Sequence, residues 1–340
     1  MDPYGLRRVV APAGVLPQRA ERLDPSLPLG EDELAIAVEA LNVDAASFRQ
    51  IEGAVGREPA AIGAEIARLV AASGKLHNPV TGSGGMLLGR VAAVGPRHPA
   101  AGTLAPGDRI ATLVSLTLTP LRLDRILAVH PERDRVDCQG QAILFASGLW
   151  ARLPADLPEA LVLAALDVCG APALVLRTLV PGMRVLVLGA GKAGALVAAA
   201  AREAQGGRGW VVAADRSRAA LDDLRRIGAV DDALEVDATD AVGTMERLRR
   251  CGPPFDLVVN ACSVPGTELS AILAARDGGS VIFFSMATSF TAAALGAEGV
   301  GKDVTMLVGN GFVPGHAELT LDLLRHLPRL RALFEQRYVR

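Results

Sequence analysis

The sequence is poor in several residue types whose abundance marks particular classes of protein. Aromatic residues make up only 4% of its 340 positions, and the basic residues do not outnumber the acidic ones, at 35 against 37. A chain without a basic excess lacks the positive face that contacts with phosphates require, which argues against a nucleic-acid-binding protein. The hydrophobic fraction of 50% excludes intrinsic disorder, which needs low hydrophobicity and a high net charge.

Signals for disulfides, metals, secretion and membrane insertion are equally scarce. The four cysteines form no C-x-x-C motif and none lies close to a histidine, so we expect no disulfide framework and no metal site. The N-terminus lacks the apolar segment of a secretory signal. The most apolar stretch, 161–180, is interrupted by Asp167, Pro172 and Arg177 and does not suit a bilayer. These absences predict a reduced, cytoplasmic, soluble protein whose partner is neither nucleic acid nor a membrane.

The apolar runs indicate two domains of different type, as a chain of this length allows. Residues 1–150 carry short β-like runs punctuated by proline and glycine, with one helical pattern at 58–73 that Gly74 ends. Two helices are predicted between 158 and 180, broken near Gly170 and Pro172. From residue 184 onward, apolar strands alternate with helices, which predicts an α/β fold with a doubly wound parallel sheet.

A glycine-rich turn follows the first of these strands, 185–188. It reads Gly189-Ala190-Gly191-Lys192-Ala193-Gly194, which fits the G-x-G-x-x-G pattern and opens a helix of small residues. The first glycine permits the tight turn, the second lets the backbone approach a pyrophosphate, and the third allows the helix to pack closely on the strand. The helix N-terminus favours an anion. The sequence therefore predicts a dinucleotide site that includes Gly189, Gly191, Lys192, Ala193 and Gly194.

An acidic residue stands where such a site binds ribose. Asp215 ends the next predicted strand, 21 residues after Gly194, and its carboxylate suits a hydrogen bond from the ribose 2′-OH; the alternative is a plain N-cap role. A carboxylate repels a 2′-phosphate, so NAD is favoured over NADP, although Arg216 can accept a phosphate if Asp215 turns away. Ligands lie outside the carboxyl ends of parallel strands. We therefore assign four later residues to the cofactor site: Ala261, Cys262, Ser285 and Met286.

The order of a β-rich domain, a dinucleotide-binding fold and a C-terminal return resembles the medium-chain dehydrogenase/reductase superfamily. Two motifs that fit are Leu104-Ala105-Pro106-Gly107-Asp108-Arg109-Ile110 and Gly301-Lys302-Asp303-Val304-Thr305. The resemblance implies a GroES-like catalytic domain at 1–168, a Rossmann domain at 169–309, and a segment at 310–340 that returns to the catalytic domain, in a homo-oligomer that is usually a dimer. Zinc-binding members use cysteine and histidine ligands. Cys169 lies near the third ligand region of those members, but no cysteine or histidine occupies the other two regions, so we expect a metal-free member.

Longer blocks resemble a narrower family, the L-erythro-3,5-diaminohexanoate dehydrogenases of lysine fermentation. They lie at 40–48, 78–87, 110–116, 283–290 and 294–303, and the similarity runs from about Tyr4 to Tyr338. The resemblance implies NAD-dependent oxidative deamination at C3, which yields 5-amino-3-oxohexanoate, ammonia and NADH. Two other functions stay open: a zinc-independent quinone or enoyl reductase that prefers NADPH, and a non-catalytic dinucleotide-binding protein.

The implied reaction needs a base, because the amine at C3 must be neutral before the hydride leaves. Asp167 follows an apolar run, and burial there would favour its neutral form and suit it to this task; the alternative is a hydrogen bond at a helix end. Asp44 lies where the superfamily places catalytic residues of the first domain, or else forms a turn. Lys302, one of only three lysines, is predicted to act as base or to bind the substrate carboxylate, or else is a solvated lysine.

The implied substrate is zwitterionic, so its site needs groups of both charges. The hydroxyls of Thr81 and Ser83 and the N–H groups of Gly84 and Gly85 are predicted to hold the carboxylate, the alternative being a tight turn without a ligand. Glu298, expected in a glycine-flanked loop, is predicted to hold an ammonium or else to be a solvated charge. His77, which adjoins the glycine-rich segment, ranks below the other candidates.

Overall fold

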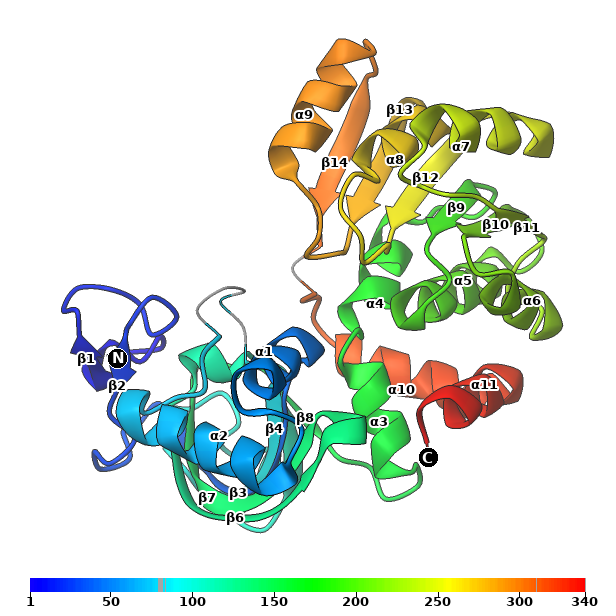
Figure 1. Cartoon of the computed structure of the whole chain (residues 1–340). Helices are drawn as coiled ribbons and strands as arrows, with labels where there is room; N and C mark the ends of the chain where they lie inside the picture. The colour runs from blue at the N-terminus through cyan, green and yellow to red at the C-terminus, as the bar shows by residue number, and fades with distance from the viewer. Residues whose placement is uncertain (79–81, 83, 310, 340) are drawn as a thin grey trace. The chain divides into compact units, whose positions relative to one another are not determined.

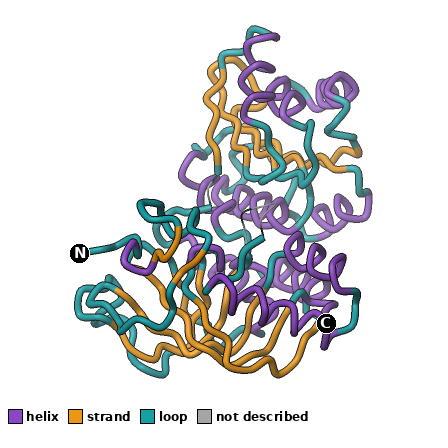
Figure 2. The backbone as a smooth tube through the Cα atoms, turned by 60° about the vertical axis from the view of Figure 1, so that its left-hand side comes forward, coloured by secondary structure: helices purple, strands orange, loops and turns teal. Residues whose placement is uncertain are grey.

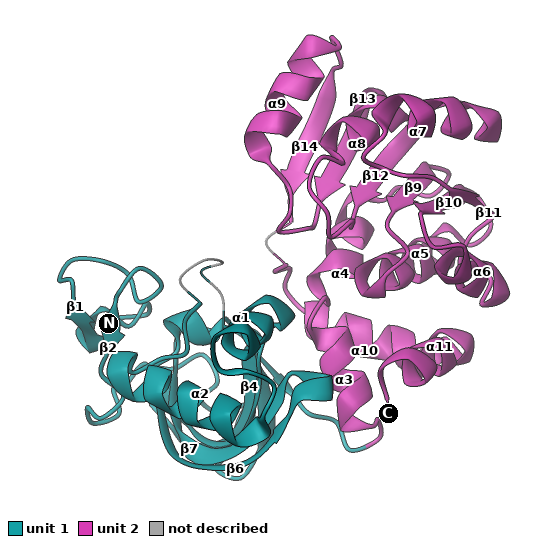
Figure 3. Ribbon diagram, viewed as in Figure 1, with its two compact units in different colours: residues 1–155 teal, residues 156–340 magenta. Residues whose placement is uncertain are grey.

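A computed structural model describes residues 1–78, 82, 84–309 and 311–339. The chain divides into two compact units, Met1–Ala155 (unit 1) and Asp156–Arg340 (unit 2), shown in Figure 3. Each unit has its own six-stranded sheet and its own apolar core.

Unit 1 is a curved antiparallel sheet with two helices and a small ribbon (Figure 1). Its elements are β1 (Val9–Ala11), β2 (Arg22–Leu23), β3 (Glu33–Asn42), α1 (Ala45–Val55), α2 (Pro59–Ser73), β4 (Met86–Val94), β5 (Arg109–Thr112), β6 (Leu121–His130), β7 (Arg135–Phe145) and β8 (Trp150–Arg152). The strand order is β6-β7-β3-β4-β5-β8, while β1 and β2 pair separately. Leu34, Ile36 and Leu87 lie in the core with no exposed surface. The expectation of a β-rich first domain is confirmed.

The helix predicted at 58–73 is confirmed as α2, and its residues explain why it forms there. Pro59 occupies the first turn, where no backbone N–H is needed. Ile62, Ile66 and Val70 recur every four residues, so they share one face of the helix and are buried in the core of the unit. Gly74 ends the helix in the left-handed conformation, with φ at 66°.

Unit 2 is a parallel sheet with helices on both sides (Figure 2). Its elements are α3 (Glu159–Leu166), α4 (Gly170–Thr178), β9 (Arg184–Leu188), α5 (Lys192–Gln205), β10 (Trp210–Asp215), α6 (Arg218–Arg226), β11 (Asp232–Glu235), α7 (Ala241–Leu248), β12 (Phe255–Asn260), α8 (Glu268–Ala274), β13 (Ala275–Phe283), α9 (Phe290–Gly299), β14 (Val304–Val308), α10 (His316–His326) and α11 (Pro328–Tyr338). The order β11-β10-β9-β12-β13-β14 reverses between β9 and β12, as in a Rossmann fold. The predicted fold class is confirmed.

The two helices before this sheet differ slightly from the expectation. The break lies between Leu166 and Gly170, and Pro172 falls in the first turn of α4, where proline is tolerated. Among the described residues, no single helix is long and apolar enough to cross a membrane; α3 and α4 pass that test only as a pair bent by 50°.

The C-terminal helices belong to unit 2. Helix α10 contacts α3, α4 and α5, and α11 contacts α3 and α5. The chain therefore divides into compact units at 155/156, whereas our predicted functional boundaries lie at 168/169 and 309/310. Compactness alone does not assign function, so the three-segment division stays a prediction.

Candidate functional site

The predicted dinucleotide loop lies at the carboxyl end of β9, at the point where the strand order reverses. Gly189 adopts a φ of 95°, which favours glycine, and a Cβ there would lie 3.0 Å from the backbone of Ala261. Gly191 is the N-cap of α5. A Cβ on Gly194 would overlap the carbonyl oxygen of Gly189, so only glycine allows this approach of helix to turn. The loop therefore has the geometry that the fingerprint predicts.

The loop also offers the open space that a pyrophosphate requires. A Cβ built on Gly191 meets no protein atom within 4 Å, so the backbone there is accessible to a ligand. The first N–H groups of α5, which begins at Lys192, carry the positive end of the helix dipole beside this space. These residues fit the diphosphate of a dinucleotide.

Asp215 is tied to this loop by its side chain. Its Oδ2 accepts a hydrogen bond from Ala190 N at 2.6 Å, and its Oδ1 accepts one from Ser217 N at 2.7 Å. The N-cap of α6 is Ser217, whose hydroxyl accepts from Ala220 N. The plain N-cap alternative for Asp215 is therefore wrong. The carboxylate lies at the end of β10, beside the glycine turn.

Arg216 lines a cavity that adjoins this strand end. The cavity has a volume of about 260 Å³ and is lined by Arg216, Glu235, Val236, Asp237, Asp240, Gly243, Thr244 and Arg247. Hydrogen bonds from Thr239 and the nearby charge of Arg216 lower the pKa of Asp237. The cavity thus has acidic and basic groups beside the position predicted for ribose.

The four later cofactor candidates follow β12 and β13 at the same sheet edge. Ala261 N donates to Leu188 O at 2.8 Å, and Cys262 N donates to the Asn260 side chain at 3.1 Å. Burial raises the pKa of the Cys262 thiol to about 12, so it is not a nucleophile at neutral pH. Ser285 Oγ accepts from Ala287 N, and Met286 is 95% exposed.

The premise for Asp167 as a buried base is wrong. The apolar helix α3 ends at Leu166, and the Asp167 side chain just beyond it is 45% exposed. Its Oδ2 accepts a hydrogen bond from Lys192 Nζ at 2.7 Å, and Lys192 also lies 5.4 Å from the centre of the Tyr338 ring. Asp167 is therefore an exposed partner of the fingerprint lysine, not a carboxyl in an apolar pocket.

Lys302 and Glu298 lie at the opposite edge of the sheet from the dinucleotide loop. Lys302 precedes β14, so it stands at the amino end of a parallel strand, where its Nζ donates to Ala275 O at 2.5 Å. Glu298 is exposed in the last turn of α9 and not in a loop, because the helix continues through Gly296 to Gly299. Neither residue belongs to the site at the carboxyl edge, which corrects both expectations.

The substrate candidates of unit 1 gather around Gly84 and Gly85. A Cβ on Gly85, whose φ is 90°, would overlap the backbone of Asn42 and crowd that of Asp44. A Cβ on Gly84 would crowd Leu76 O and Thr117 N. The two glycines thus lie against three other parts of the chain, at 42–44, at Leu76 and at 116–117. Thr81 and Ser83 lie outside the described residues.

Asp44 has the turn-forming role that was its alternative. It is the N-cap of α1, and its carboxylate accepts hydrogen bonds from Ala46 N at 3.2 Å, Ser47 N at 3.0 Å and Ser47 Oγ at 2.5 Å. Such caps satisfy backbone donors that the helix itself leaves unpaired. The backbone of Asp44 nevertheless lies against Gly85, and that of Leu76, the neighbour of His77, lies against Gly84. We call the segments that pack on these two glycines, with Asp44 and His77, the unit 1 cluster.

His77, which ranks last among the candidates from the sequence, has a defined environment in the structure. It is half-buried, and its Nδ1 lies 2.9 Å from Thr117 Oγ1. Burial, with the charge of Lys75, lowers the pKa of His77. Lys75 is itself fully buried, and burial lowers its pKa to about 8. His77 is thus neutral at neutral pH, and Thr117 orients its ring.

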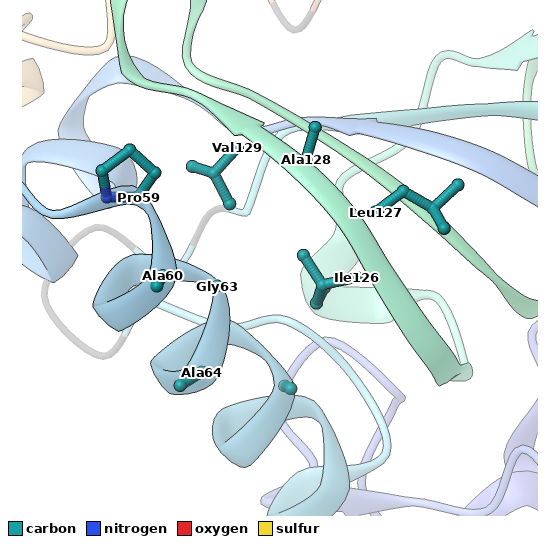
Figure 4. Close-up of a pocket in the computed structure, with 9 residues that line it drawn as sticks. Pro59, Ala60, Gly63, Ala64, Ile126, Leu127, Ala128 and Val129 are labelled. Atoms are coloured by element: carbon teal, nitrogen blue, oxygen red, sulfur yellow. The ribbon is translucent and has the colours of Figure 1, made fainter.

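A separate groove in unit 1 is lined by residues without a functional group that could act in catalysis. It has a volume of about 430 Å³ between α2 and β6 (Figure 4) and is lined by Pro59, Ala60, Gly63, Ala64, Ala67, Ile126, Leu127, Ala128 and Val129. None of these side chains titrates or carries a nucleophile. Within the described part of the chain, no group of three or more histidine, cysteine, aspartate or glutamate residues is placed to hold a metal ion.

Comparison with known proteins gives close relatives along nearly the whole chain. Residues 7–154 match the family described as the L-erythro-3,5-diaminohexanoate dehydrogenase N-terminal domain. The L-erythro-3,5-diaminohexanoate dehydrogenase of Acetoanaerobium sticklandii is 47% identical over 339 residues, which cover 99% of this chain and 98% of that protein. The enzyme of the same name from Fusobacterium nucleatum subsp. nucleatum is 46% identical over 342 residues, with coverages of 99% and 98%.

Solved structures support the fold at much lower identity. A mycobacterial quinone oxidoreductase matches with a TM-score of 0.57 and 20% identity, covering 95% of this chain and 92% of that one. The CurK enoyl reductase matches with a TM-score of 0.54 and 17% identity, covering 94% and 86%. At these identities the similarity supports the architecture but does not identify the reaction.

Proposed function

The chain belongs to the L-erythro-3,5-diaminohexanoate dehydrogenase family, and from this premise we propose that it oxidises the C3 amine of L-erythro-3,5-diaminohexanoate with NAD. The products are 5-amino-3-oxohexanoate, ammonia and NADH, in the degradation of lysine. The observation that carries the proposal is the 47% identity to a dehydrogenase of that name over 99% of the chain. The quinone and enoyl reductases share only the fold, at 20% identity or less.

The reaction sets separate tasks for the chain. A nicotinamide held beside the glycine loop would supply the acceptor for the hydride of C3, and water would convert the oxidised substrate, an iminium, to the ketone and ammonia. The protein must hold the dinucleotide, remove a proton from the C3 ammonium and bind a carboxylate and a second ammonium. The loop at Gly189–Gly194, with Asp215 beside it, suits the first task.

For the proton acceptor we propose His77. Its pKa is lowered by burial and by the charge of Lys75, so it is free to accept a proton at neutral pH. When Nδ1 carries the proton and donates to Thr117 Oγ1, the lone pair is on Nε2. Asp44, in the same cluster, is the second candidate, although its carboxylate is already occupied as a helix cap.

We propose that the same unit 1 cluster binds the carboxylate and the second ammonium of the substrate. Gly84 and Gly85, together with Thr81 and Ser83, remain the proposed carboxylate cradle. The packing of Gly84 and Gly85 against neighbouring backbone supports a fixed position for these two glycines.

The test is an assay with L-erythro-3,5-diaminohexanoate and either NAD or NADP, in which reduced cofactor and ammonia are both measured. We expect stoichiometric NADH and ammonia. Reduction of a quinone or an enoyl thioester by NADPH, with no turnover of the diamino acid, would instead identify the reductase alternative. Tight nucleotide binding without turnover of any of these substrates would identify a non-catalytic protein.

Replacing Asp215 by alanine is expected to raise the KM for NAD by about 10-fold or more, with a much smaller effect on kcat. A charge-assisted hydrogen bond to the ribose is worth about 1.5–3 kcal/mol, and the variant also loses the contact with Ala190 N. Activity with NADP should rise, because the repulsion of a 2′-phosphate is removed. Steady-state kinetics with both cofactors measure these changes. Asp222→Ala, an exposed position on α6, is the matched control, and an unchanged KM in Asp215→Ala would refute the ribose assignment.

We also propose a homodimer that acts in the cytoplasm. Strand β14 is an edge of the described sheet, and Val308 on it is 56% exposed. Phe290 and Leu295 of the neighbouring helix α9 are exposed as well, which favours self-association over a free surface. Light scattering should give twice the chain mass of 35.3 kDa; a monomer at micromolar concentration would contradict the proposal.

A further inference from the structure

The end of the last helix, α11, contacts the dinucleotide loop within unit 2. Arg337 Nη1 donates to Ala190 O at 3.4 Å, while Nη2 and Nε bond to Asp223 Oδ2 at 2.6 Å and 3.1 Å. The Arg337 side chain is only 19% exposed. The two bonds to Asp223 hold the guanidinium in position, and this places Nη1 where it makes a longer contact with Ala190 O.

The contact with Ala190 O has a consequence for the next amide. In a trans peptide the C=O and the N–H lie in one plane and point in opposite directions. Ala190 O and Gly191 N belong to the same peptide, so a donor that holds Ala190 O also fixes the direction of the Gly191 N–H. The peptide on the other side of Ala190 is held by Asp215, which accepts from Ala190 N.

We propose that Arg337 is a positioning residue of the dinucleotide site, which orients the Gly191 amide toward the diphosphate of the cofactor. Gly191 has open space where a Cβ would be, so its backbone is the part of the loop that a diphosphate can approach. The inference rests on the proposed dinucleotide-dependent function and adds a residue to it that lies about 150 positions from the fingerprint.

A purely structural role for Arg337 would have a different signature. If the residue only docked α11 on α6 through Asp223, its loss would lower thermal stability and affect all ligands of the site equally. If it orients the Gly191 amide, its loss weakens only those ligands that carry a diphosphate. Adenosine, which lacks phosphate, separates the two roles.

The experiment compares Arg337→Gln with the wild-type protein by titration with NAD and ADP, and by competition with adenosine. We expect affinity for NAD and ADP to fall about 10-fold, as for the loss of one well-oriented hydrogen bond donor, and affinity for adenosine to stay within a factor of two. Arg331→Gln is the matched control, because Arg331 lies on the same helix and pairs with Glu335. Hydrogen exchange in the 189–194 segment should be faster in Arg337→Gln alone.

Two outcomes overturn the inference. Equal affinity for NAD in Arg337→Gln and wild type, or an equal loss for adenosine and ADP, shows that Arg337 does not act through the diphosphate. If the wild-type protein binds no NAD, the proposed function fails with it, and that result is distinct from the first two. Should the glutamine variant not fold, Arg337→Lys keeps the charge but not the fork that spans both partners, and we expect it to lose about 3-fold in NAD and ADP affinity.

Discussion

Replacing Gly191 by alanine is expected to abolish measurable NAD binding while the protein stays folded. Apart from its chain neighbours, the Cβ of alanine would meet no protein atom within 4 Å, and the backbone φ of −72° does not require glycine, so we expect the fold to be kept. The same methyl group would occupy the space through which a diphosphate reaches the backbone. Because this clash excludes the close approach of the diphosphate to the backbone, we expect a loss of affinity of about 100-fold or more, equivalent to about 2.8 kcal/mol.

Gly194→Ala makes the informative contrast. Its Cβ would overlap Gly189 O, so helix α5 has to move away from the turn, which costs about 1–3 kcal/mol of stability and also displaces the loop. We expect both the thermal midpoint and the NAD affinity to fall in this variant, whereas Gly191→Ala lowers the affinity alone.

Calorimetric titration with NAD and thermal unfolding measure the two effects together. Gly296→Ala, in the interior of α9, is the control, because its Cβ would make ordinary contacts of 3.5 Å and alanine favours a helix. Normal NAD affinity in Gly191→Ala would show that the diphosphate does not pass over the second glycine, and the dinucleotide site would have to be assigned elsewhere.

The glycine loop was predictable from sequence because each of its requirements is local. A positive φ, an open backbone and a close approach of helix to turn each need glycine at one position, and the apolar runs on either side identify the strand and the helix. The predicted strand at 185–188 is β9 (Arg184–Leu188), and the predicted helix of small residues after the turn is α5 (Lys192–Gln205).

The catalytic candidates were less predictable because their environment is not local. Asp167 follows six buried residues, yet one further position carries it past the end of α3, where it is exposed. Lys302 and Glu298 lie within a family block, but a residue that precedes a parallel strand lies at the amino edge, far from ligands that bind at the carboxyl edge. Strand direction would have excluded both from the site.

Arg337 and Tyr338 had no sequence signal at all. Their contacts with Ala190 and Lys192 join positions nearly 150 residues apart, and no periodicity or motif predicts these contacts. His77 had a weak signal, since it adjoins the glycine-rich segment. Its pairing with Thr117 could not be predicted from the sequence, because Thr117 lies 40 residues away and is brought close by the packing around Gly84.

His77→Gln is expected to lower kcat by about 100-fold or more with little change in affinity for NAD. Removal of a general base costs 10²–10⁴-fold in typical enzymes, and glutamine keeps a polar group near Thr117 without accepting a proton. Stopped-flow or steady-state measurement of NADH production gives kcat, and titration gives the NAD affinity. His326→Gln, at an exposed position on α10, is the control.

The pH profile of kcat/KM is the sharper test, because it follows the protonation of His77 itself. Burial and the charge of Lys75 lower the pKa of His77 below its usual value of 6.5, so the base stays neutral, and activity stays constant, down to mildly acidic pH. Activity then falls as His77 takes up a proton. In Lys75→Met the neighbouring charge is gone, so the acid limb should move to higher pH, whereas a base elsewhere in the site would leave it in place. An acid limb that is identical in wild type, Lys75→Met and His77→Gln would reassign His77 to a structural hydrogen bond with Thr117 and leave Asp44 as the remaining base in the cluster.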